Sequence, residues 1–169
     1  GETLNLNFKN DIRIPGLSDE ELEKVGFVPN SSPGSGASDG LGGTTSTNTH
    51  AHGAHVNSVG FGDNVVSRYT TGQEWTTTME FIPQHAKGAY WYHPHYHPSV
   101  NQQVYGGLSG FLQIGDSLSA IPGFENVPRN LAQIKQFGVN VDPESGELKL
   151  ENWASMPNGN QLVVNTVNG

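Results

Sequence analysis

The sequence predicts an all-β protein made of many short strands joined by turns, and three observations support this. Gly and Pro interrupt the chain often, with 22 Gly and 10 Pro among 169 residues. Only 34% of the residues are hydrophobic and 14% are charged, a mixture that disfavours a helical bundle. Apolar and polar residues alternate with a period of two in several short segments, which is typical of half-buried strands.

Strands are expected where this alternation is clearest. In one segment Trp75, Thr77, Met79 and Phe81 fall on one face, and the residues between them fall on the other. The remaining expected strands cover residues 3–8, 89–97 (running into a loop), 111–115, 131–137 and 161–167. Residues 142–146 form a turn sequence between the last two of these strands.

Three other segments are expected to be turns, loops or connectors. Ser18 followed by Glu21 is a capping-box pattern, which predicts a short helix through about Lys24. Residues 30–43 are rich in Gly and Ser and predict an insertion loop within one domain. Residues 121–130 form a connector that contains Pro and Asn.

Composition excludes several classes of function. The net charge is −8, from 16 acidic and 8 basic residues, so a nucleic-acid partner is disfavoured. The chain has no Cys, which excludes disulfides, Cys-ligated zinc, iron–sulfur clusters, thiol catalysis and a blue copper site within it. No apolar run approaches the ~20 residues of a membrane helix, and no secretory signal is visible.

The histidines indicate a metal site. Six of the seven His fall in two clusters, at positions 50, 52 and 55 and at positions 93, 95 and 97. On extended chain, residues two apart point to one face, so His50 pairs with His52 and His93 with His95. Two such pairs on adjacent strands would bring four imidazoles together. A surface or structural role is about equally plausible for a single His-x-His, but two copies in one chain favour a metal.

The residue pattern leaves the metal open among Cu, Zn, Fe and Ni, all of which imidazole binds well. A cupin is disfavoured, since it would place Glu four or five residues after the His-x-His pair. Those positions hold Val56 and Asn57 after the first pair, and Ser99 and Val100 after the second. A zinc hydrolase with three His ligands remains possible, although no nearby residue resembles its general base.

Two segments resemble the copper motifs of multicopper oxidases, the laccase-like enzymes. Residues 47–56, Thr-Asn-Thr-His-Ala-His-Gly-Ala-His-Val, resemble the first motif, and residues 88–97, Gly-Ala-Tyr-Trp-Tyr-His-Pro-His-Tyr-His, resemble the second. Residues 62–64, 82–85 and 103–110 also resemble family segments. The resemblance implies an antiparallel Greek-key β-sandwich of cupredoxin type over residues 1–116, truncated at its N-terminus. Residues 117–169 then resemble the connector and part of a second cupredoxin domain.

The resemblance also implies a set of copper ligands. His50 matches the ligand of a type 2 copper, His52 and His93 match ligands of one copper of a type 3 pair, and His95 matches a ligand of its partner. These coppers form the trinuclear cluster that reduces dioxygen to water. Asp63 resembles an acid that relays protons toward the cluster, although a lone Asp in a loop is as often a solvated turn residue.

The other histidines are expected to play supporting roles. His55 and His97 are expected to orient ligands or support the fold, and His85 to anchor the turn before the second motif. Pro98 stands where the family commonly has Gly.

The resemblance implies partners that this chain does not contain. The remaining cluster ligands and the Cys-containing blue copper site lie in a later domain of the family. Dioxygen and a small reducing substrate are the expected reactants, and the periplasm or the cell exterior is the expected compartment. The alternative is a copper-binding module without turnover, such as a carrier or store.

Overall fold

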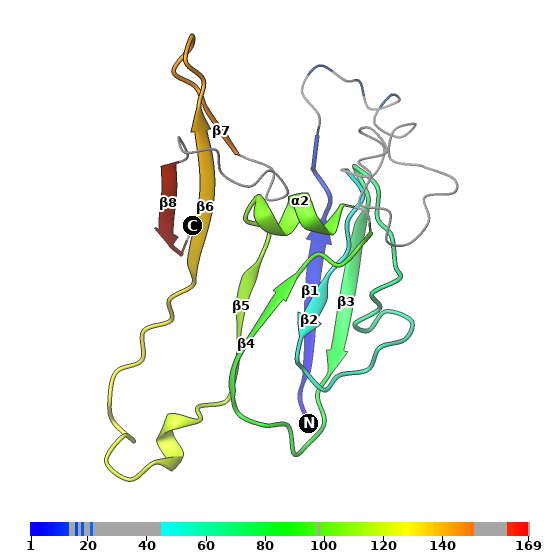
Figure 1. Cartoon of the computed structure of the whole chain (residues 1–169). Coiled ribbons are helices and arrows are strands. Elements are labelled where there is room, and N and C mark those ends of the chain that lie inside the picture. Colours follow the sequence, from blue (N-terminus) through cyan, green and yellow to red (C-terminus); the bar gives the residue numbers. More distant parts are fainter. Residues whose placement is uncertain are drawn as a thin grey trace.

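The fold is all-β and antiparallel, as the sequence predicts. It is described by a computed structural model for residues 1–13, 16, 18, 21, 45–97, 99–150 and 162–168. Its strands form three antiparallel sheets with the orders β1-β3, β2-β4-β5 and β7-β6-β8. Figure 1 shows the first two sheets together and the third sheet beside them.

The first sheet pairs β1 (Thr3–Lys9) with β3 (Glu74–Glu80). Both strands alternate as predicted, and the side chain of Met79 is fully buried. Phe8 lies opposite Trp75 in the register, and their rings stack with centroids 5.1 Å apart. The period-two pattern therefore packs this sheet by one apolar face.

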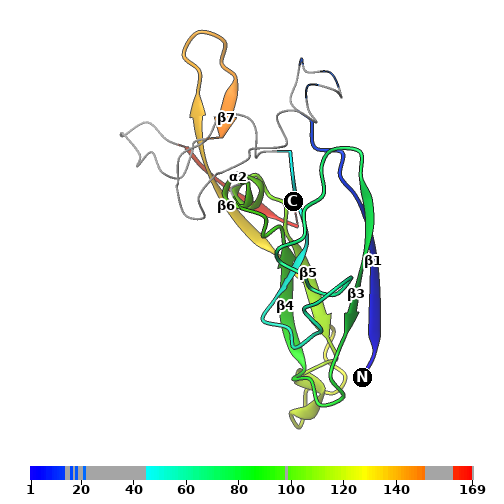
Figure 2. The same cartoon turned by 90° about the vertical axis from the view of Figure 1, so that its right-hand side faces the viewer.

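The second sheet carries the histidine motifs. It consists of β2 (His50–His52), β4 (Gly88–His93) and β5 (Gly110–Ile114). Figure 2 shows this sheet and the first as two layers of a sandwich. Phe8 of the first sheet meets Tyr92 of the second edge to face, with ring centroids 6.5 Å apart.

The third sheet follows the connector, which contains a short 3-10 helix, η2 (Leu118–Ala120). It consists of β7 (Leu148–Leu150), β6 (Ile134–Val141) and β8 (Leu162–Val167). β6 begins three residues and ends four residues later than the expected strand at 131–137. β7 was not expected. Ile134, Val163 and Val167 are exposed on this sheet, whereas Val139 of β6 is buried.

One helix was not predicted: α2 (Val100–Tyr105) follows the second histidine motif. Ser99 occupies its N-cap position, but the Ser99 hydroxyl donates to the backbone of Ser46 and does not cap the helix. Gln103 is buried within the helix, and its amide also donates to Ser46 O. Contacts with the segment before β2 therefore place α2, and a local sequence signal does not reveal such contacts.

The remaining sequence predictions are only partly visible. The capping box is present, since Glu21 accepts from both the backbone and the hydroxyl of Ser18, and Glu21 N donates to Ser18 Oγ at 3.3 Å. The rest of the predicted helix, the loop at 30–43 and Pro98 lie outside the described residues. No helix in the described part of the chain is long and apolar enough to cross a membrane.

Candidate metal centre

Pairing of β2 with β4 brings the two histidine motifs together. The strands are antiparallel, and His50 lies directly opposite His93 in the register. Ala51, between His50 and His52, is buried on the other face of β2. Both histidines of the first motif therefore lie on one face of the sheet, and His93, the register partner of His50, lies on the same face.

The four candidate ligands lie close to one another. From the His50 ring centroid, the distances to the rings of His52, His93 and His95 are 5.7, 5.3 and 5.0 Å. The His52 and His93 rings are 5.3 Å apart, and the His93 and His95 rings 6.0 Å. One ring nitrogen from each of His50, His52 and His93 lies within 4.8 Å of the others, which makes these three a possible metal-binding group.

His52 and His93 face each other most directly. Nδ1 of His52 lies 3.0 Å from Nε2 of His93. Nδ1 of His93 donates to Pro94 O at 2.7 Å, so Nε2 of a neutral His93 carries the lone pair. Two nitrogens bound to one metal at ~2 Å would lie at a similar separation, roughly 3 Å. The pair is therefore arranged to hold a metal once the shared proton moves away from Nδ1 of His52.

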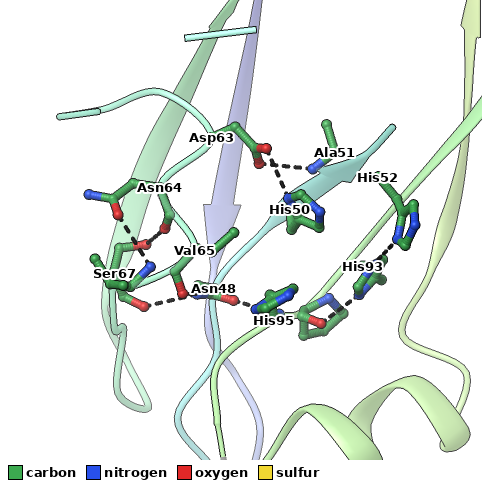
Figure 3. A network of polar contacts seen from close by, with 12 residues as sticks. Asn48, His50, Ala51, His52, Asp63, Asn64, Val65, Ser67, His93 and His95 are labelled. Atoms are coloured by element: carbon green, nitrogen blue, oxygen red, sulfur yellow. Dashed lines mark hydrogen bonds and ion pairs between the residues drawn. The ribbon is translucent and has the colours of Figure 1, made fainter. Parts of the chain in front are cut away.

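Asp63 orients His50, as Figure 3 shows. Nδ1 of His50 donates to Asp63 Oδ2 at 2.9 Å, and the backbone N–H of Ala51 donates to Asp63 Oδ1 at 2.9 Å. A carboxylate only accepts, so the His50 proton lies on Nδ1 and Nε2 is available as a donor atom. Carboxylate–histidine pairs of this kind commonly fix a metal ligand in place.

His95 reaches the site by a different route from the one expected. β4 ends at His93, so His95 is not brought to the site by strand alternation. Its ring lies near His50, but it is not part of the three-residue group. The backbone N–H of His95 instead donates to Asn48 Oδ1 at 2.7 Å (Figure 3). Asn48 is a residue that sequence reasoning missed, because nothing in its type marks it as more than a motif neighbour.

His55, His85 and His97 make contacts of other kinds. His85 accepts from the backbone N–H of His55 at 2.8 Å, and its other ring nitrogen donates to Ala86 O at 2.8 Å. His85 therefore links the segment after β2 to the turn before β4. His97 is exposed, with its ring 5.6 Å from that of His95. None of the three belongs to the metal-binding group found among the described residues.

The electrostatics of the site favour neutral imidazoles. Burial lowers the pKa of His93, and the neighbouring His50, His52 and His95 lower it further, against a raising effect of the bond to Pro94 O. Burial is also the main cause that lowers the pKa of His95, and the positive charge of His50 lowers it further. A metal binds neutral imidazole, so these shifts keep both side chains ready to coordinate near neutral pH.

These shifts predict an acid-sensitive fold in the metal-free chain. Both pKa values lie below the ordinary 6.5, so the unfolded state binds more protons than the folded state in this range. The free energy of unfolding should therefore be highest above about pH 6.5 and fall as the pH drops below it. Thermal unfolding at a series of pH values measures this. His93→Gln, which does not titrate, should flatten the profile, and an unchanged slope in that variant would contradict the prediction.

Comparison with known proteins agrees with the histidine geometry. The family model described as "Multicopper oxidase" matches residues 40–119, a stretch that includes both histidine motifs and Asp63. Residues 40–119, just under half of the chain, are thus similar to multicopper oxidases. The resemblance noted in the sequence is thereby confirmed for the segment that builds the candidate site.

Two curated multicopper oxidases are similar to this chain. "Multicopper oxidase mco" of Staphylococcus haemolyticus is 42% identical over 72 residues, and the protein of the same name from Staphylococcus epidermidis is 40% identical over 72 residues. Each match covers 42% of this chain and 15% of the relative. The matched stretch thus spans a small part of a complete multicopper oxidase.

The residues present are suited to copper. The donor set of the group is entirely imidazole nitrogen, which borderline metals such as Cu(II) favour. His50 is oriented by Asp63, and His93 by Pro94 O, so the second nitrogen of each of these two rings carries a lone pair. The site is therefore organised before any metal arrives.

Proposed function

We propose that this chain is the copper-binding part of a multicopper oxidase and supplies half the His ligands of a trinuclear copper cluster. His50 would hold the type 2 copper, His52 and His93 one copper of the type 3 pair, and His95 the other. The observation that carries the proposal is the meeting of the two motifs across β2 and β4, with Nδ1 of His52 3.0 Å from Nε2 of His93. That pairing matches the two residues assigned to the same copper.

The bound coppers would supply the reduction of dioxygen to water, with electrons from a small reducing substrate. The part played by this chain is to hold and orient. The β2–β4 register sets His50 against His93, and the bonds to Asp63 and Pro94 O fix which ring nitrogen faces the site. Fixed ligands lower the reorganisation that metal binding would otherwise require.

Asp63 is the residue that we assign to proton handling. Asp63 is 7% exposed, and its carboxylate contacts the site through Nδ1 of His50. Asp63 is therefore able to hold a proton next to the cluster and pass it on through the His50 side of the site. Its second contact, with the Ala51 backbone, fixes its direction.

The remaining cluster ligands and a Cys-ligated copper would come from another cupredoxin domain, in the same chain or in a neighbouring subunit. We propose that residues 1–116 form the copper-binding cupredoxin domain and that residues 117–169 form the connector and part of a second such domain. The separate sheet β7-β6-β8 and its exposed Ile134 and Val163 support this division. We place the oxidase in the periplasm or outside the cell, by family resemblance.

A copper carrier or store is the second candidate, and electron paramagnetic resonance separates it from an oxidase. In the complete copper-loaded protein, an oxidase should show fewer paramagnetic Cu(II) spins than total copper, because the type 3 pair is magnetically coupled. A carrier should show every copper as an isolated Cu(II) that a chelator removes. Full spin recovery together with complete chelation would overturn the oxidase proposal.

A further inference from the structure

Asn48 joins three segments at the histidine site. Its side chain is 3% exposed, and all three of its hydrogen bonds are to backbone atoms. Nδ2 donates to Val65 O at 2.8 Å and to Ser67 O at 3.0 Å, while Oδ1 accepts from His95 N at 2.7 Å (Figure 3). We propose that Asn48 is a positioning residue that sets His95 against His50. The inference rests on the proposed function, because it concerns the same set of ligands.

The strand ladder explains why such a residue is needed. Antiparallel pairing fixes His93 opposite His50, but β4 ends at His93. The backbone of His95 therefore has no ladder partner on β2. The Asn48 amide takes the place of that partner, two residues before His50 on the same segment, and so ties the end of the second motif to the start of the first.

The same amide also holds the loop that carries Asp63. Val65 and Ser67 follow Asp63 closely, and Asp63 in turn accepts from His50. His50 contacts both the Asp63 carboxylate and the His95 ring. The buried Asn48 side chain therefore connects the segments that carry these two groups. A shift of Asn48 would displace both relative to His50.

Only an amide satisfies this arrangement. The site needs two donors directed at carbonyls and one acceptor directed at an N–H, which Asn provides with its NH₂ and C=O groups. Asp has the same shape but no donor, and its charge would face the carbonyls of Val65 and Ser67. Ser has only one donor and is too short to span the same groups. Losing these part-buried hydrogen bonds is costly in either case.

The chain contains a matched control at Asn10. This side chain is 1% exposed, and its Nδ2 donates to Thr45 O at 2.6 Å and Tyr69 O at 2.9 Å. Its Oδ1 accepts from Ile12 N at 3.0 Å. Asn10 thus has the same number and kind of bonds in the same fold, and none of those bonds is to a histidine.

The experiment compares Asn48→Asp with Asn10→Asp in the full chain, using Cu(II) alone as the probe. Both variants should lose thermal stability, because each removes the two hydrogen bonds that a buried amide donates to backbone carbonyls. Only Asn48→Asp should speed hydrogen exchange at the His95 amide, as followed by NMR without metal. It should also change the Cu(II) paramagnetic spectrum and weaken Cu(II) binding by about 10–100-fold, as loss of an outer hydrogen-bond partner typically does. If Asn48→Asp does not fold, Asn48→Ser is measured instead.

Two results would overturn the inference. One is an unchanged His95 amide in the Asn48 variant, and the other is an equal loss of Cu(II) affinity in the two variants at matched folded fraction. The proposed function is tested separately by His52→Ala in the otherwise unmodified chain. It fails if this variant binds Cu(II) as tightly as the unmodified chain does. The His95 amide is measured without metal, so the positioning of the second motif is tested in either event.

Discussion

His52→Ala and His93→Ala are each expected to weaken Cu(II) binding by more than about 100-fold, since outer-partner losses alone reach ~10–100-fold. The two ring nitrogens face each other at 3.0 Å, so removal of either ring deletes a direct ligand and leaves its partner unsupported. His55→Ala and His97→Ala should cost much less, because neither ring belongs to the metal-binding group among the described residues.

Competition titration of the four variants against a chelator of known affinity measures this difference. His97→Ala is the sharper control, because His97 is exposed and lies in the same motif as His93. His55→Ala preserves the backbone N–H that donates to His85, so it tests the ring alone. Equal losses at all four positions would mean that the ligand set assigned from the family is wrong.

The 169 residues alone are expected to bind copper weakly and to reduce no dioxygen at a measurable sustained rate. Four His ligands shared among three coppers leave open positions that water fills, and a loosely held metal exchanges with solvent. The chain also has no Cys, so it cannot form the thiolate-ligated copper that accepts electrons from substrate in this family. Activity should require the domain that supplies the other ligands.

Oxygen consumption with a phenolic substrate tests this expectation. The purified chain is loaded with Cu(II) and compared with the complete protein from the same coding sequence, and free Cu(II) at the same concentration gives the background. Activity in the complete protein and background rates in the isolated chain are expected. Sustained turnover by the chain alone would instead point to a self-contained copper enzyme.

The sequence predicts the strands of the first sheet well because their faces differ in polarity. Thr77 and Met79 are buried and the glutamates at the ends of β3 are exposed, as alternation predicts. The pairing of β2 with β4 was also expected in outline, since two His-x-His segments form one site only on neighbouring strands. Their register, with His50 opposite His93, became visible only in the structure.

Other features depend on contacts between segments far apart in the chain. The α2 helix is placed by bonds from Ser99 and Gln103 to Ser46, which span 53 and 57 positions, so no local sequence pattern reveals them. The Asn48 bonds to His95 and Val65 span 47 and 17 positions. Asp63 was noticed only through the family resemblance, because a lone Asp in a loop does not reveal that His50 is its partner.

The location of bound copper tests the central claim most directly. Crystals of the copper-loaded protein, measured on both sides of the copper absorption edge, would show each copper as an anomalous difference peak. We expect one peak between His52 and His93, within ~2 Å of a ring nitrogen of each, and further density beside His50 and His95. Copper bound only at His55, His85 or His97, with the His52–His93 hydrogen bond intact, would contradict the account.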